Sequence, residues 1–231
     1  MKKSLLITID GPAGSGKTTT SRMLADRLGY RYIDTGALYR SVAVEVQRTG
    51  TSPDDDDGLK RLCSTLSIKF VTGEKGLRIL SQGSDITDQI RASEISMLAS
   101  AVSARPVVRK YLLNLQREMG RGKGAVFEGR DMGTVVFPDA DVKFFLNAFL
   151  KVRARRRYLE LASTSSQTLA KVEKDMQRRD ENDSSRSLAP LKPARDAIII
   201  DSSELSADKV VERMLSFIED RLHPSNPDLA K

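Results

Sequence analysis

A segment near the amino terminus combines glycines with a lysine and a threonine in the pattern G-x-x-x-x-G-K-T, from Gly11 to Thr18. Such segments bind phosphate groups, because their glycines let successive backbone N–H groups turn inward toward anionic oxygens. A lysine at this position can reach the β- and γ-phosphates of a nucleoside triphosphate, and the threonine hydroxyl can bind Mg²⁺. The residues expected to contact a bound nucleotide are Gly11, Pro12, Ala13, Gly14, Ser15, Gly16, Lys17, Thr18 and Thr19.

Arginines gather in the second half of the chain. Arg153, Arg156 and Arg157 have i, i+3 and i+4 spacing, so they share one face of the helix expected between residues 147 and 161. Beside a phosphate-binding loop, such arginines could neutralise the charge of transferring phosphates. The alternative is a solvated basic helix face, which is the usual explanation of such runs, and we favour the phosphate-binding interpretation.

A second polar cluster contains Arg179, Asp183 and Arg186, which share one face if the helix expected at residues 169–179 continues. Near a nucleotide this set offers phosphate-binding guanidinium groups and an acceptor for ribose hydroxyls. On an open surface the same residues would form ion pairs worth only about 0.5 kcal/mol each.

A third cluster, Glu128 to Thr134, directly follows an apolar segment expected to be a buried strand. Parallel α/β sheets bind ligands at the carboxyl ends of their strands. Glu128 or Asp131 could therefore hold an Mg²⁺-bound water or a substrate hydroxyl, and Arg130 could hold a phosphate. The alternative is a tight turn with an internal Arg–Asp pair. The chain has no Asn-Lys-x-Asp segment for reading guanine, and its single histidine lies near the carboxyl terminus.

The elements that must position these residues follow from apolar runs and helical spacing. A strand at residues 5–9 precedes the glycine loop and a helix at residues 19–28 follows it, which is the context that a phosphate-binding loop requires. Four more strands carrying the same βα pattern imply an α/β fold, a P-loop core with a doubly wound parallel sheet of about five strands. These strands are expected at residues 30–34, 125–128, 142–146 and 197–201, and the remaining helices at 37–47, 93–119 with a break at Pro106, and 209–222.

Residues 51–92 interrupt this pattern. We expect a helix capped by Ser52 with Pro53 in its first position, since the four aspartates that follow favour the positive end of a helix. A metal site is the less favoured explanation of the aspartates. Alternating segments at 67–71 and 77–80 predict a β-hairpin, so 51–92 should be a small α+β insertion. Two polar helices joined by serines at 163–166 should form a helical lid. The expected division is a core of 1–50, 93–150 and 180–231, the insertion 51–92 and the lid 151–179.

Composition narrows the possible partners. The 231-residue chain carries a net charge of +7, which favours anionic ligands, but only 5% of its residues are aromatic and none is tryptophan. That scarcity argues against a stacking surface for single-stranded nucleic acid. One cysteine, Cys63, excludes an internal disulfide and is expected in the core. No apolar run approaches the roughly 20 residues that span a membrane. We expect a cytoplasmic monomer with no nucleic-acid or membrane partner.

Four segments carry specific motifs, at residues 11–17, 34–40, 129–140 and 189–191. Together they resemble the bacterial cytidylate kinases, and the resemblance extends over essentially the whole chain. The Gly-Arg-Asp-Met-Gly-Thr stretch is far more specific than the glycine loop. The resemblance implies transfer of the γ-phosphoryl group of ATP to CMP or dCMP with Mg²⁺, in pyrimidine nucleotide metabolism. It also implies that the insertion binds the nucleoside monophosphate.

The resemblance also assigns site residues. Ser100, Arg109 and Asp131 would read the cytosine edge, whose N4 amine and N3 and O2 acceptors suit a carboxylate and a guanidinium. Thr18, with Glu128 acting through a water, would hold Mg²⁺. The residues implied in catalysis are Lys17, Arg130, Arg153, Arg157 and Arg179, the arginines at 153 and 157 acting from the lid. The residues implied in substrate binding are Thr35, Tyr39, Arg40, Ser100, Arg109, Arg130, Asp131, Arg179, Asp183 and Arg186, with Arg40, Arg130 and Arg186 on the monophosphate and Asp183 on the ribose.

Two other functions remain open. A P-loop kinase could use another acceptor, such as UMP, AMP or a non-nucleotide alcohol, and the set Ser100, Arg109 and Asp131 would then not read cytosine. The basic charge alternatively permits a nucleic-acid-binding ATPase, whose hydrolysis of ATP would be stimulated by RNA or DNA in a salt-dependent manner.

Overall fold

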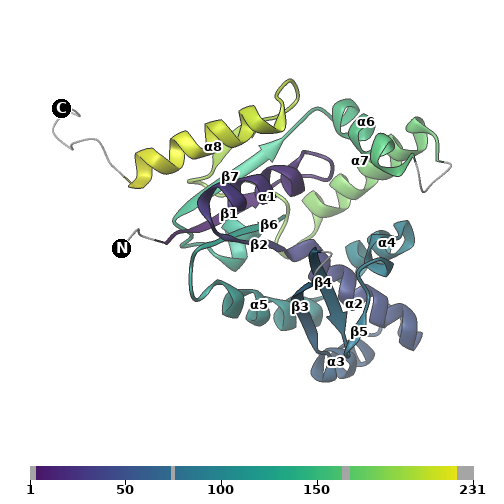
Figure 1. Ribbon diagram of the computed structural model, residues 1–231. Helices are drawn as coiled ribbons and strands as arrows, with labels where there is room; N and C mark the ends of the chain where they lie inside the picture. The colour runs from purple at the N-terminus through teal and green to yellow at the C-terminus, as the bar shows by residue number, and fades with distance from the viewer. Residues whose placement is uncertain (1–3, 74–75, 163–166, 223–231) are drawn as a thin grey trace. The chain divides into compact units, whose positions relative to one another are not determined.

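The computed structural model describes residues 4–73, 76–162 and 167–222 (Figure 1). The chain divides into two compact units, the first made of residues 1–33 and 120–231 and the second of residues 34–119. The first unit carries the glycine loop, and each unit has an apolar core of its own.

A five-stranded parallel sheet organises the first unit. Its order is β2-β6-β1-β7-β8, so that β1, which leads into the glycine loop, lies in the centre. Asp10 at the end of β1 stands opposite Gly129 of β6 and Phe145 of β7. The expected α/β fold is confirmed. The strand bounds are β1 (Leu6–Asp10), β2 (Arg31–Asp34), β6 (Ala125–Gly129), β7 (Val142–Asn147) and β8 (Ile198–Asp201).

Helices α1 (Lys17–Leu28) and α8 (Ala207–Leu222) lie side by side over this sheet in Figure 1. Both present apolar residues at helical spacing to the strands, and these residues share one core cluster with β1 and β7. Every residue of β1 and of β6 is buried. The polar residues of these strands, Thr8 and Asp10 of β1 and Glu128 of β6, are therefore buried as well.

Helices α6 (Leu150–Leu161) and α7 (Leu169–Ser185) correspond to the two polar helices predicted from the sequence. They pack on each other through a small apolar cluster around Ala154, Val172 and Met176. Helix α7 continues past Arg179 to Ser185, which places Arg179 and Asp183 on one helix, as their spacing required. The third member of the predicted face, Arg186, follows the helix in an extended backbone conformation, so that part of the prediction was wrong. The serines predicted to join the two helices lie outside the described residues.

The second unit combines helices with an antiparallel sheet, in the order β3-β4-β5. The predicted hairpin and the predicted helix break before Pro106 are both confirmed. Its core holds Cys63, also as predicted, together with residues from every helix of the unit. Because that single core includes helices on both sides of residues 51–92, the unit is longer than the predicted insertion. Its elements are α2 (Thr35–Thr49), α3 (Asp56–Thr65), β3 (Ile68–Gly73), β4 (Gly76–Ser81), β5 (Ser84–Asp85), the 3₁₀ turn η1 (Gln89–Arg91), α4 (Ser93–Val102) and α5 (Pro106–Gly120).

The predicted start of the helix after residue 51 was wrong. Helix α3 begins at Asp56, and the carboxylate of Asp55 caps it by accepting the Gly58 N–H at 2.9 Å. The Ser52 hydroxyl instead accepts the Asp54 N–H at 3.2 Å, in a turn before the helix. Several adjacent aspartates can cap a helix equally well, so the sequence did not single out one. Over the described residues, no group of three or more His, Cys, Asp or Glu side chains could hold a metal ion, and no helix is long and apolar enough to cross a bilayer.

Candidate active site

The glycine loop lies tightly against β7 and α6. A Cβ atom on Gly11, whose φ is 149°, would stand 2.0 Å from the carbonyl oxygen of Leu146. A Cβ atom on Gly14, whose φ is 71°, would stand 2.9 Å from the carbonyl oxygen of Arg153. Both positions require glycine, because a side chain would be strained and would collide with backbone. The loop conformation is therefore set by neighbouring elements before any phosphate arrives.

Lys17 is folded back onto its own loop. Its Nζ donates a hydrogen bond to the carbonyl oxygen of Pro12 at 2.6 Å, and the Ser15 hydroxyl donates to the same oxygen at 3.0 Å. Burial and the charge of Arg130 together lower the pKa of Lys17 to about 7, although the carboxylate of Glu128 opposes the shift. Bound phosphate oxygens would favour the charged ammonium. This lysine is thus poised to change both its partner and its charge when an anion binds.

Two oxygen ligands meet beside the loop. The Thr18 hydroxyl donates to the Oε1 atom of Glu128 at 2.8 Å, although the two residues belong to α1 and β6. Glu128 is 5% exposed and stands opposite Ile9 in the sheet. A hydroxyl and a carboxylate are the hard oxygen ligands that Mg²⁺ prefers, with water and phosphate oxygens completing its shell. The pair fits the expected metal site.

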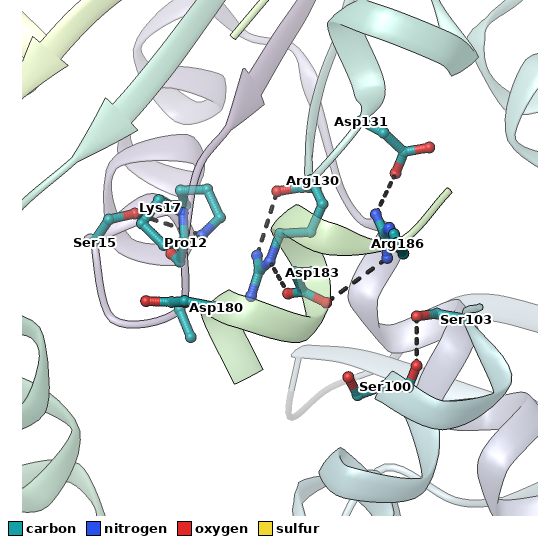
Figure 2. Close-up of polar contacts among 12 residues, drawn as sticks. Pro12, Ser15, Lys17, Ser100, Ser103, Arg130, Asp131, Asp180, Asp183 and Arg186 are labelled. Atoms are coloured by element: carbon teal, nitrogen blue, oxygen red, sulfur yellow. Dashed lines mark hydrogen bonds and ion pairs between the residues drawn. The ribbon is translucent and has the colours of Figure 1, made fainter. Parts of the chain in front are cut away.

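A network of four charged side chains joins the turn after β6 to the end of α7 (Figure 2). Arg130 Nε donates to Asp183 Oδ2 at 3.0 Å, and Arg186 lies 3.7 Å from Asp183 Oδ1 and 3.8 Å from Asp131 Oδ1. Burial raises the pKa of Asp183, but the charges of Arg130, Arg179 and Arg186 outweigh it, so the pKa is lowered overall. Asp183 is therefore an ionised carboxylate held among guanidinium groups.

Asp10 is a site residue that the sequence analysis missed. Its carboxylate accepts the backbone N–H groups of Met132 at 2.9 Å and Gly133 at 2.7 Å, directly after Asp131. Burial raises the pKa of Asp10 to about 6, although both backbone hydrogen bonds oppose the shift. A carboxylate at the end of a largely apolar strand was the available signal.

The arginines of the predicted lid occupy different environments. Arg153 is 6% exposed, and its guanidinium donates to Ala13 of the glycine loop at 3.1 Å and to Asp180 of α7 at 2.6 Å. Arg157 instead pairs with Glu160 at 3.0 Å, one turn along α6. Arg179 influences the pKa values of both Lys17 and Asp183, so its charge acts at the centre of the unit's polar site.

A further link to the glycine loop was also missed. Arg156 donates to the carbonyl oxygen of Ser202 at 2.6 Å and to its hydroxyl at 3.1 Å. The Ser202 hydroxyl in turn donates to the carbonyl oxygen of Ser15 at 2.9 Å. Ser202 follows β8 and is 3% exposed. Two arginines of α6 therefore attach that helix to the loop, Arg153 directly and Arg156 through Ser202.

The remaining predicted substrate residues lie in the second unit. Arg109 of α5 donates to the Tyr39 hydroxyl at 2.8 Å, and its guanidinium carbon lies 5.6 Å from the centre of the Tyr39 ring. Arg40 donates to Asp34 at 2.8 Å, and Thr35 opens α2 in a buried position. Ser100 lies in α4, where its carbonyl oxygen accepts the Ser103 hydroxyl at 2.8 Å (Figure 2).

The predicted cytosine-reading set draws on both units. Ser100 and Arg109 belong to the second unit and Asp131 to the first. Their joint role stays a prediction, as does the role of Arg40 with Arg130 and Arg186 on a monophosphate.

Comparison with known proteins identifies the relatives of this chain. A family model described as cytidylate kinase matches residues 7–220. A cytidylate kinase from Geobacter sulfurreducens is 51% identical over 95% of each chain, and one from Pseudomonas fluorescens is 46% identical over 94% of this chain and 96% of its own.

Solved structures show the same fold at lower identity. The shikimate kinase of Bacteroides thetaiotaomicron matches with a TM-score of 0.50 and 17% identity over 94% of this chain and 99% of its own. A gluconokinase from Sinorhizobium meliloti matches with a TM-score of 0.50 and 12% identity, covering 98% of this chain and 100% of its own.

Proposed function

The chain belongs to the cytidylate kinase family, and we propose that it transfers the γ-phosphoryl group of ATP to CMP or dCMP, giving ADP and CDP or dCDP. The observation that carries this proposal is the family match over residues 7–220, which includes every predicted site residue. In the transfer, the bond from the γ-phosphorus to the ADP oxygen breaks as a phosphate oxygen of the acceptor bonds to that phosphorus. Such a reaction depends on positioning and charge neutralisation more than on a strong base.

The donor site is the glycine loop. Its N–H groups, the amino end of α1 and Lys17 bind the triphosphate of ATP, which then replaces the Pro12 carbonyl as the partner of Lys17. Thr18 and Glu128 would hold Mg²⁺, and this ion would neutralise negative charge on the phosphate oxygens. Arg153 and Arg179 complete the positive surroundings, and Arg157 acts from α6.

The acceptor site begins at the Arg130–Asp183 pair. Arg130, Arg186 and Arg40 bind the monophosphate, and Asp183 accepts hydrogen bonds from the ribose hydroxyls. This proposal is supported by Asp183 being ionised and by Arg130 being held in place before substrate binds.

We assign cytosine recognition to Asp131, Arg109 and Ser100. A carboxylate can accept from the N4 amine, which uracil lacks, and a guanidinium can donate to N3 and O2. The Arg109–Tyr39 contact supports this assignment, because it orients the guanidinium in the unliganded protein. Thr35 adds a hydroxyl at the start of α2.

An acceptor panel tests the proposal. ADP release is followed with ATP, Mg²⁺ and, in separate reactions, CMP, dCMP, UMP, AMP, GMP or no acceptor. Release that depends on CMP and dCMP supports the proposed function. A preference for another monophosphate would mean that the enzyme uses that acceptor instead, and the assignment of the fold would stand.

We further propose that the enzyme acts as a cytoplasmic monomer in pyrimidine nucleotide metabolism, with neither nucleic acid nor a membrane as a partner. Its net charge of +7 is explained by anionic nucleotide substrates. The rival ATPase hypothesis predicts that RNA or DNA stimulates ADP release without any acceptor. Under the kinase proposal neither polymer has that effect.

A further inference from the structure

Asp10 is a buried carboxylate that the transfer mechanism does not use. It is the last residue of β1 and directly precedes Gly11, yet its carboxylate accepts hydrogen bonds from the backbone amides of Met132 and Gly133, more than 120 residues further along the chain. We propose that Asp10 is a positioning residue for the acceptor site: it holds the turn that carries Arg130 and Asp131 in its substrate-binding conformation. This inference rests on the proposed function of those two residues.

The two hydrogen bonds offset the cost of burying the carboxylate. Asp10 is 3% exposed, and an isolated carboxylate in such surroundings is strongly unfavourable. Bonds of 2.7 and 2.9 Å to an ionised acceptor are short and strong compared with neutral pairs. The Met132 and Gly133 amides belong to the first turn of the π-helix η2 (Met132–Val136). One side chain thus fixes the start of that turn.

The same turn determines the direction of Asp131. The carbonyl oxygen of Asp131 accepts the N–H groups of Val135 at 2.9 Å and Val136 at 3.2 Å. Asp10 binds the next two amides, so the peptide unit between Asp131 and Met132 is fixed through both its carbonyl oxygen and its N–H group. A shift of this peptide would move Asp131 relative to Arg186 and move Arg130 relative to Asp183.

The turn packs directly against Asp10 and its neighbours at Gly133, because glycine has no side chain to separate them. A Cβ atom on Gly133 would lie 3.1 Å from the Thr8 hydroxyl, 3.2 Å from Cδ of Lys143 and 3.4 Å from Oδ2 of Asp10. The turn therefore rests directly on the sheet at Gly133. Lys143, whose side chain is 7% exposed, secures the far end of the segment by donating to Pro138 and Asp196.

The function that follows is a mechanical link between the two substrate sites. Asp10 begins the donor loop through its backbone and holds the acceptor turn through its carboxylate. Loss of the carboxylate should therefore weaken acceptor binding first, since Gly11 and Gly14 keep the donor loop fixed against β7 and α6.

The test compares Asp10→Asn with Thr8→Val. Asparagine keeps the size of the side chain but sets an NH₂ group against one backbone N–H. Thr8 lies on the same strand, is fully buried, and its hydroxyl has no hydrogen-bond partner among the described residues, so valine is a matched control. Asp10→Asn should raise the KM for CMP about tenfold and change the KM for ATP less than about twofold. Thr8→Val should change neither KM. Equal increases in both KM values, or a fall in kcat alone, would overturn the proposal.

Amide hydrogen exchange gives a readout that needs no activity. The amides of Met132 and Gly133 should exchange faster in Asp10→Asn than in Thr8→Val, with the strand amides of β1 unchanged. Unaltered exchange at both amides would refute the positioning role even if CMP proved to be the wrong acceptor. If the wild type were inactive toward CMP but the two amides still exchanged faster in Asp10→Asn, only the proposed function would be rejected.

A second variant covers the case in which Asp10→Asn fails to fold. Gly133→Ala keeps the carboxylate but adds a methyl group 3.1 Å from the Thr8 hydroxyl and 3.4 Å from Asp10 Oδ2, so the contact between the turn and the sheet must adjust by a few tenths of an ångström. It should produce the same selective increase in the KM for CMP. A KM for CMP equal to that of the wild type would contradict the proposal.

Discussion

The guanidinium of Arg130 and the carboxylate of Asp183 are bonded to each other across 3.0 Å, although Arg130 follows strand β6 and Asp183 lies in the last turn of helix α7. Asp183 is 4% exposed, so the pair is largely desolvated. Breaking such a pair by removing one partner leaves a buried charge uncompensated. The Arg130–Asp183 part of the proposed acceptor site is therefore formed before substrate binds.

Replacement of Asp183 should weaken acceptor binding and stability together. Asp183→Ala removes the carboxylate that lies among three arginines, so the KM for CMP should rise at least about tenfold and the unfolding midpoint should fall. Glu181→Ala is the matched control, because Glu181 is exposed on the same helix and bonds only Gln177 among the described residues. Steady-state kinetics and thermal unfolding measure both effects. If the Asp183 variant behaved like the Glu181 variant in both measurements, Asp183 would have no role in the acceptor site.

Donor binding should take up a proton. Burial lowers the pKa of Lys17 to about 7, so at pH 8 the lysine is mostly neutral, and triphosphate binding should restore its charge. We expect uptake of about 0.9 proton per MgATP at pH 8, measured by titration calorimetry in buffers of different ionisation enthalpy. Lys17→Arg should take up none, because arginine stays charged. Equal uptake by both proteins would assign the proton to another group.

The same pKa has a consequence for stability. The folded protein binds fewer protons than the unfolded chain between about pH 7 and pH 10.5, since the unfolded lysine keeps its usual pKa. The Lys17 contribution therefore makes the free energy of unfolding increase with pH across this window. Denaturant titrations of the wild type and Lys17→Met at pH 7 and pH 9 should show a smaller increase in the variant. An identical pH dependence would contradict the lowered pKa.

Glu128 should set the requirement for magnesium. Glu128→Gln keeps a partner for the Thr18 hydroxyl but removes the negative charge, so half-maximal activity should need about tenfold more Mg²⁺. The measurement is a Mg²⁺ titration at fixed ATP, with Glu128→Asp as a variant that retains the charge. If the glutamine variant has a normal Mg²⁺ requirement, the ion is held without Glu128.

Asp131 should control the choice of base. Asp131→Ala removes the proposed acceptor of the cytosine amine, so the ratio of kcat/KM for CMP to that for UMP should fall about tenfold or more. The KM for ATP should stay within about twofold of the wild type. An unchanged ratio would assign base recognition to other residues.

Much of the fold could be predicted because its signals are local. The apolar runs of β1, β6 and β7 and the glycines before Lys17 identify strand, loop and helix without any long-range information. The helical spacing of Arg179 and Asp183 likewise required only that α7 continue to Ser185. The start of α3 could not be predicted in this way, since neighbouring aspartates compete for the cap.

The contacts that complete the site could not be predicted from residue types. Asp10 binds backbone amides of Met132 and Gly133, and every residue but proline has such an amide, so the sequence carries no mark of the partner. The bond from Ser202 to the Ser15 carbonyl is hidden for the same reason. Folding alone brings together side chains and backbone groups that are far apart in the chain.

The most direct test of the central claim is to identify and count the products. Purified protein is incubated with ATP, Mg²⁺ and CMP, and the nucleotides are separated and quantified over time. We predict one CDP for each ADP, no ADP without CMP, and no product with Lys17→Ala. ADP formed without CDP, or CMP left unchanged while ATP is consumed, would contradict a cytidylate kinase activity.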